Sequence, residues 1–97
     1  MAEKIATLKK DENISIITLD DGKANVFSPE MSKQINECLD QVPTEDGCLI
    51  ITGREGMFSG GLDLKIIQSG DIDHIQEMSF SAFKLLARIF SFQRPVI

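Results

Sequence analysis

A strand–helix–strand order in the first half of the chain constrains its fold most. Residues 14–19 and 48–52 are apolar runs rich in isoleucine, which is typical of buried strands. Between them, apolar residues recur at helical spacing over 29–42, and Ser28 followed by Pro29 is a sequence typical of a helix start. A helix that joins two parallel strands forms a βαβ unit, so we predict an α/β fold.

A further strand is expected at the beginning of the chain. Residues 5–9 predict a strand that pairs with 14–19 as an antiparallel hairpin, through a four-residue connection at 10–13. Because Ile17 and Leu19 interrupt what would otherwise be a polar face, we expect the second strand to be covered on both sides.

The second half of the chain predicts two more helices. Residues 45–47 predict a loop, 63–68 a short helix and 73–92 a long helix. Residues 94–97 predict the beginning of another strand, since a proline can start a strand but cannot continue a helix. The long helix carries apolar residues on more than one face, which favours burial against a surface beyond this chain.

Charge and hydropathy exclude several function classes. The net charge of −5 and the sequence pI of about 4.7 argue against a general electrostatic contact with nucleic acid or with an anionic membrane. No apolar run approaches the ~18 residues of a transmembrane helix. Residues 1–5 lack the apolar core of a signal peptide, so the expected location is the cytoplasm.

Few residues suggest metal or redox chemistry. Cys38 and Cys48 lie in helix and strand patterns, and we interpret them as buried reduced thiols. His74 is the only histidine and has no metal-ligand spacing around it, so a surface position is expected and no metal site is predicted. The chain contains neither a GxGxxG nor a GxxxxGK[ST] fingerprint.

The pair Gly60-Gly61 is the main candidate for a ligand site. It lies between the apolar run 48–52 and a predicted helix, where glycine lets the backbone approach a ligand closely. N–H groups at a helix start suit an anion or a developing oxyanion. A tight turn without a ligand remains the alternative. Asp63 is more typical of a helix cap than of a catalytic acid, and Ser59 has no GxSxG context.

Four segments together resemble one known family. Residues 58–65, FSGGLDLK, resemble the F-[SA]-[AG]-G-[AL]-D-[IL] signature of the crotonase superfamily, the enoyl-CoA hydratase/isomerase family. Residues 23–31 resemble its A-x-N-A-L-S-x-E-M segment, 47–53 the strand before the signature, and 94–97 its K-P-V-I/V strand. These segments occur in the family's order and cover nearly all of the chain.

The resemblance implies a crotonase-like ββα superhelix that is incomplete in this chain. Residues 1–97 would form the N-terminal part of a single crotonase-like domain. The implied activity is water addition to, or double-bond migration in, an acyl-CoA thioester through an oxyanion-stabilised enolate. The family's second oxyanion donor and its acid/base carboxylates would lie beyond Ile97, so the isolated chain is predicted to be inactive. The alternative is a truncated, non-catalytic fragment that serves as a CoA-binding or structural module.

The resemblance also implies partners and site residues. It implies no metal or redox cofactor, CoA as part of the substrate, and a homo-oligomer, a trimer or hexamer, in the full-length form. Leu62 matches the residue whose backbone N–H is one oxyanion donor. Many relatives have Arg at the position of Ala24, and Lys23 would supply that charge here. The implied substrate-binding residues are Lys23, Ala24, Ser59, Gly60, Leu62, Asp63 and Leu64.

Overall fold

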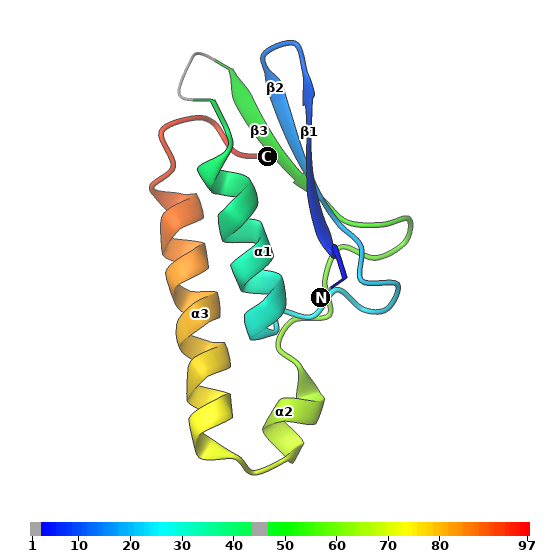
Figure 1. Ribbon diagram of the computed structural model, residues 1–97, viewed down its shortest axis with the longest axis vertical. Helices are drawn as coiled ribbons and strands as arrows, with labels where there is room; N and C mark the ends of the chain where they lie inside the picture. Colours follow the sequence, from blue (N-terminus) through cyan, green and yellow to red (C-terminus); the bar gives the residue numbers. More distant parts are fainter. Residues whose placement is uncertain (1–2, 44–46) are drawn as a thin grey trace.

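The computed structural model describes residues 3–43 and 47–97, and it confirms the α/β class (Figure 1). The loop predicted at 45–47 therefore lies outside the described residues except for Gly47. The sheet has the order β1-β2-β3, with β1 antiparallel and β3 parallel to β2. The elements in chain order are β1 (Ala6–Asp11), β2 (Ile14–Leu19), α1 (Pro29–Asp40), β3 (Cys48–Thr52), α2 (Leu64–Gln68) and α3 (Ile72–Phe90).

The hairpin between β1 and β2 is tighter than predicted. Pairing continues to Asp11 opposite Ile14, so only Glu12 and Asn13 connect the strands. Glu12 adopts a φ of 56°, the left-handed conformation that a short hairpin turn requires. The predicted four-residue connection is therefore wrong. The left-handed conformation of Glu12 lets two residues reverse the chain, so Lys10 and Asp11 remain part of the strand.

Capping residues decide where the helices begin and end. The Ser28 side chain accepts a hydrogen bond from the Met31 N–H, which confirms the predicted start of α1. That helix ends at Asp40, two residues earlier than predicted, where the Gln41 N–H donates to the carbonyls of the last turn. The long helix begins at Ile72, one residue before the predicted start, because Asp71 accepts from the His74 N–H and caps it. It ends at Phe90, two residues before the predicted end, where the Ser91 N–H donates to carbonyls of the last turn.

Both long helices lie on one face of the sheet. Figure 1 shows α1 against the strands and α3 beside α1. On β2, the side chains that face these helices are buried, whereas Ile14, Ile16 and Thr18 on the opposite face are only half-buried. We expected both faces of β2 to be covered, but within the described residues only the face toward the helices is. The fully buried side chains of this core include Ile17, Leu19, Met31, Ile35, Leu49 and Leu85.

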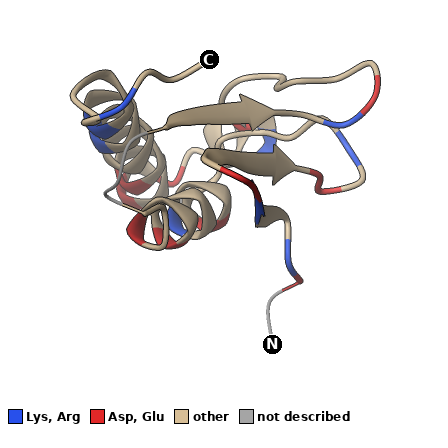
Figure 2. Cartoon of the chain, turned by 90° about the horizontal axis from the view of Figure 1, so that it is seen from above, with Lys and Arg blue, Asp and Glu red and all other residues tan. Residues whose placement is uncertain are grey.

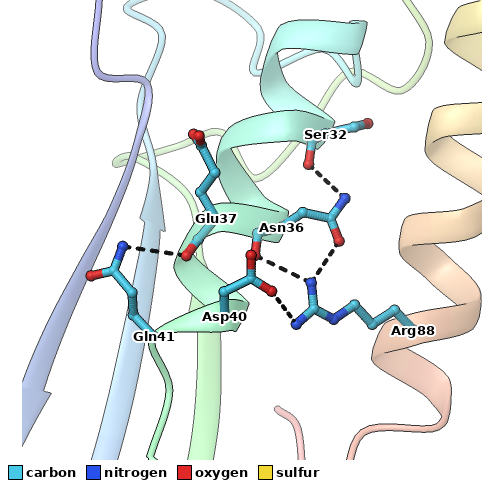
Figure 3. A network of polar contacts seen from close by, with 6 residues as sticks. All are labelled: Ser32, Asn36, Glu37, Asp40, Gln41 and Arg88. Carbon is cyan, nitrogen blue, oxygen red and sulfur yellow. Dashed lines mark hydrogen bonds and ion pairs between the residues drawn. The ribbon is translucent and has the colours of Figure 1, made fainter.

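A polar contact on α1 anchors α3 beside it (Figure 3). Arg88 donates from Nη1 to the Asn36 carbonyl oxygen at 3.2 Å and to its Oδ1 at 2.9 Å. Its Nη2 forms an ion pair with Asp40 at 2.8 Å. The Asn36 amide donates in turn to the Ser32 carbonyl at 3.0 Å. One guanidinium therefore binds two successive turns of α1 and sets the register between the helices.

The end of the chain adds to the sheet beside β3. The Leu49 N–H donates to the Pro95 carbonyl at 2.9 Å, and the Ile97 N–H donates to the Leu49 carbonyl at 2.9 Å. Leu49 and Val96 form a parallel bridge. The strand predicted to start near Pro95 is therefore confirmed as a short parallel pairing.

Charged and apolar residues separate along the elements. The strands β2 and β3 carry no charged residue, whereas helices, loops and β1 carry them (Figure 2). No helix within 3–43 and 47–97 is long and apolar enough to cross a membrane. The outward apolar face expected for the long helix is present: Phe80, Phe83, Leu86 and Phe90 of α3 are between 59% and 94% exposed.

Candidate functional site

Two loops leave the sheet at the same edge. Strands β2 and β3 run parallel, with Thr18 opposite Thr52, so their carboxyl ends lie side by side. The loop 20–28 follows β2 and the loop 53–63 follows β3. Parallel α/β sheets bind ligands at this edge, and here it brings the predicted segments 23–24 and 58–63 together.

The first loop is shaped by aspartate side chains. Asp20 Oδ1 accepts from the Gly22 N–H at 2.9 Å, and Asp21 Oδ1 accepts from the Lys23 N–H at 2.7 Å. An aspartate side chain that accepts from the backbone N–H two residues further on stabilises a tight turn. The Lys23 carbonyl accepts from Arg54 Nε at 2.8 Å, which connects this turn to the second loop. Lys23 is thus held at the loop surface with its ammonium group exposed.

Backbone hydrogen bonds pair the two loops directly. The Gly60 N–H donates to the Ala24 carbonyl at 2.7 Å, and the Phe27 N–H donates to the Gly61 carbonyl at 2.7 Å. A Cβ on Gly60 would lie 3.3 Å from the Ala24 Cβ, so the loops approach closely at this glycine. Gly61 has a φ of 91°, which favours glycine over any other residue.

Among the N–H groups from Gly60 to Asp63, one is left for a ligand. Gly60 donates to Ala24, Gly61 donates to Ser59 Oγ at 3.0 Å, and Asp63 donates to Met78 Sδ at 3.4 Å. The Leu62 N–H has no acceptor among the described residues. The predicted run of free N–H groups is therefore reduced to a single donor in a half-exposed loop. One such donor can bind an anion or the oxygen of a polarised carbonyl.

The helix after this loop contributes little to the site. Helix α2 has only five residues, so it sums few peptide dipoles. Asp63 Oδ1 accepts from the Lys65 N–H at 2.9 Å and caps α2. The capping role expected for Asp63 is therefore observed, and the helix dipole that the sequence predicted at the glycine pair is weak.

A groove of about 430 Å³ lies between the first loop and the start of α2. It brings together three of the predicted binding residues, Lys23, Ala24 and Asp63, and adds Lys65. Its lining also contains Glu3 and Asp21, so its charge is mixed rather than purely basic. The other predicted residues, Ser59, Gly60, Leu62 and Leu64, do not line this groove.

The structure separates these other residues by role. Ser59 Oγ donates to the Asn25 carbonyl at 2.8 Å and Gly60 donates to Ala24, so both act between the loops. Leu62 and Leu64 are 39% and 65% exposed. Ser59 has a main-chain acceptor and no neighbouring base, which agrees with the absence of a nucleophile motif.

Asn25 was not singled out by sequence reasoning. It is fully buried, with 0% exposure and a φ of 50°. Its amide donates to the carbonyls of Leu19 at 2.8 Å and Phe58 at 3.1 Å. The only signal in the sequence is an asparagine in a loop of the type that tolerates a left-handed conformation, which does not reveal these partners.

The remaining candidates stay structural. His74 is exposed at the start of α3, and within 3–43 and 47–97 no three or more His, Cys, Asp or Glu side chains are grouped so that they could hold a metal ion. Both cysteines are free thiols; Cys38 is buried as expected, whereas Cys48 is only half-buried, so its expected full burial is wrong. Burial raises the pKa of the Cys38 thiol; the Lys4 charge lowers it and Glu37 raises it. A protonated buried thiol matches the interpretation of Cys38 as an unreactive residue.

Comparison with known proteins identifies relatives over nearly all of the chain. The sequence profile described as "Enoyl-CoA hydratase/isomerase" matches residues 9–97. A "Probable enoyl-CoA hydratase" of Bacillus subtilis (strain 168) is 32% identical over 95 residues, which cover 94% of this chain and 36% of the relative.

Solved structures share the fold. The structure of a probable enoyl-CoA hydratase from Mycobacterium tuberculosis H37Rv has a TM-score of 0.89 and 35% identity, covering 95% of this chain and 39% of that one. An apo structure described as a Mycobacterium tuberculosis enoyl-CoA isomerase has a TM-score of 0.87 and 33% identity, covering 96% and 40%. The crotonase-like fold, incomplete in this chain, is confirmed. The chain spans less than half the length of these relatives.

Proposed function

Because the chain belongs to the enoyl-CoA hydratase/isomerase family, we propose that residues 1–97 form the N-terminal, CoA-binding part of a single crotonase-like domain acting on acyl-CoA thioesters. The observation that carries this proposal is the Leu62 N–H, which has no acceptor within 3–43 and 47–97 while its neighbours Gly60, Gly61 and Asp63 are all bonded. A donor kept free between bonded neighbours supports a role in binding a ligand oxygen.

The proposed chemistry follows from the family's reactions. The thioester carbonyl oxygen would accept from the Leu62 N–H, and negative charge would grow on that oxygen as an enolate forms. Losing one donor of an oxyanion hole costs about 3 kcal/mol, so one backbone N–H is a substantial part of such a site. Water addition and double-bond migration both use this enolate, and the relatives carry both descriptions. No separate metal or redox cofactor is proposed.

The proposed substrate-binding residues fall into two groups. Lys23, Ala24 and Asp63 line the groove, where the Lys23 ammonium would approach a CoA phosphate. Lys65 lines the same groove and is added to the predicted set. The second group holds or flanks the free donor and consists of Ser59, Gly60, Leu62 and Leu64.

The alternative is a truncated, non-catalytic fragment that serves as a CoA-binding or structural module. The exposed apolar face of α3, with Phe83 at 72% and Phe90 at 94% exposure, supports contact with further protein surface. A homo-oligomer, a trimer or hexamer in the full-length form, remains our proposal for the whole protein.

Calorimetric titration of the 97-residue chain with CoA tests the proposal. Lys23→Met and Lys65→Met each remove a charge from the groove, whereas Lys9→Met removes an exposed charge from β1, outside it. An ion contact in a half-exposed site contributes about 1 kcal/mol, so each groove variant should bind CoA roughly fivefold more weakly. Lys9→Met should bind as the wild type does.

Two results would count against this assignment. Equal CoA affinity for Lys23→Met, Lys65→Met and Lys9→Met would remove the groove from the binding site. No measurable binding by the wild-type chain would reject CoA binding by this half of the domain. Repeating the titration with dephospho-CoA would show which phosphate the lysines contact.

A further inference from the structure

The side chain of Asn25 connects three segments of the site. Its Nδ2 donates to the Leu19 carbonyl at the end of β2, at 2.8 Å, and to the Phe58 carbonyl in the second loop, at 3.1 Å. Its Oδ1 accepts from the Asp21 N–H in the first loop at 2.9 Å. The carboxamide therefore uses both donor hydrogens and its acceptor at a position with 0% exposure.

The main chain of Asn25 continues this connection toward Leu62. The Ser59 hydroxyl donates to the Asn25 carbonyl at 2.8 Å, and the Ser59 Oγ accepts in turn from the Gly61 N–H at 3.0 Å. Gly61 immediately precedes Leu62. The orientation of the peptide that carries the free N–H is thus connected to Asn25 through one hydroxyl group.

Asparagine suits this position better than glycine or aspartate, the two residues that could most easily replace it. At a φ of 50°, glycine, asparagine and aspartate are the residues that fit with least strain. Glycine has no amide to join the loops. Aspartate is similar in shape, but its carboxylate would face the Leu19 and Phe58 carbonyl oxygens without a hydrogen to donate.

We propose that Asn25 is a positioning residue for the acyl-CoA site. It joins the loop after β2 to the loop after β3 and thereby holds the Leu62 N–H in the direction of the ligand. The inference rests on the CoA site proposed above for the ligand, but the joining of the loops can be measured without any ligand. Loss of the carboxamide should loosen the two loops while the sheet and its core remain.

Hydrogen exchange by NMR on the full 97-residue chain measures the joining directly. The Gly60 and Phe27 amides form the backbone-to-backbone hydrogen bonds between the loops, and the Leu49 amide, bonded to Pro95, reports on the sheet. Asn25→Gly removes the side-chain hydrogen bonds to Leu19, Phe58 and Asp21, so exchange at Gly60 and Phe27 should rise at least about tenfold relative to Leu49. CoA affinity, measured on the same folded sample, should fall about tenfold or more.

Arg54→Met is the matched control, because Arg54 also connects the loops but does so through an exposed bond to the Lys23 carbonyl. Exchange at the Gly60 and Phe27 amides should stay within about twofold of the wild type in this variant. Equal effects of the two variants would show that any bond between the loops suffices, which would overturn the assignment to Asn25.

The two proposals fail in different ways. Unchanged exchange in Asn25→Gly overturns the positioning role, whatever CoA does. Raised exchange with unchanged CoA affinity reduces Asn25 to a purely structural residue and also overturns it. If the wild type binds no CoA, the proposed function fails, and the exchange data alone decide whether Asn25 joins the loops.

A second variant keeps the test decisive if Asn25→Gly does not fold. Ser59→Ala leaves the buried carboxamide in place and removes only the hydroxyl between the Asn25 carbonyl and the Gly61 N–H. Exchange at the Gly61 amide should rise, and CoA affinity should fall roughly threefold to tenfold. No change in either quantity would overturn the proposed connection from Asn25 to the Leu62 peptide.

Discussion

The importance of the Gly61 backbone conformation can be tested by comparison with Gly70, which also has a positive φ but lies outside the candidate site. Gly61 has a φ of 91° and Gly70, between α2 and α3, has a φ of 74°. A Cβ added at either glycine meets no atom within 4 Å. Alanine at these two positions therefore introduces backbone strain without a steric clash, and only Gly61 lies in the candidate site.

The expected loss of stability follows from that strain. An alanine in such a conformation costs about 1–3 kcal/mol. The lower entropy of the unfolded chain offsets about 0.4–1 kcal/mol of this. With the middle of both ranges, about 2 kcal/mol of strain less about 0.7 kcal/mol, Gly61→Ala and Gly70→Ala should each lose roughly 1–2 kcal/mol of unfolding free energy. In a chain of 97 residues this lowers Tm by roughly 4–16 °C.

Binding should separate the two variants. Relief of strain at position 61 rotates the peptide that carries the Leu62 N–H and weakens the bond from the Phe27 N–H to the Gly61 carbonyl, which is 2.7 Å long. CoA affinity, measured by calorimetry below the unfolding transition, should fall about tenfold in Gly61→Ala. Gly70→Ala should bind CoA as the wild type does.

Two outcomes would refute this reasoning. Equal CoA affinities of the two variants would show that the conformation of the signature turn does not matter for binding. A Tm unchanged within about 2 °C in both variants would show that the positive φ values carry no strain, since even 1 kcal/mol should be visible in a chain of this size.

Three further predictions concern the rest of the chain. Arg88→Met removes the bonds to Asn36 and Asp40 and should lower the unfolding free energy, measured by urea denaturation, by about 1–2 kcal/mol. Lys84→Met, on the exposed side of α3, should leave it unchanged, and equal stabilities of the two variants would show that the Arg88 contact with α1 does not stabilise the fold. Burial raises the pKa of Cys38, so iodoacetamide should label this thiol more slowly in the native than in the unfolded chain. Because the pKa of Cys38 is higher in the folded than in the unfolded chain, the protonated thiol favours the folded state at neutral pH, and this stabilisation is lost as the pH rises through the folded pKa. The purified 97-residue chain should not hydrate crotonyl-CoA, and turnover above a buffer control would contradict this prediction.

Much of the fold is readable from local sequence. The strands at 14–19 and 48–52 and the helix start at Ser28-Pro29 were predicted with their observed beginnings, because β-branched runs and caps act within a few residues. Helix α3 shows the limit of such signals. Asp71 and Asp73 are equally good caps by residue type, and only the hydrogen bond from the His74 N–H to Asp71 decides between them.

The sequence by itself determined the family resemblance and the approximate place of the site. The glycine pair and the segment at 23–31 matched the family's two contact segments, and the structure brings them together because parallel strands end at one edge of a sheet. Tertiary structure alone decided which backbone donors remain free. The Asp63 N–H is bonded to Met78, 15 residues away, and the Gly60 N–H is bonded to Ala24. The family resemblance pointed to the Leu62 N–H as a donor, but spacing within the chain carries no information about such partners. Neither the bonding of the N–H groups beside Leu62 nor the contacts of Asn25 could therefore be predicted before the loops were seen packed together.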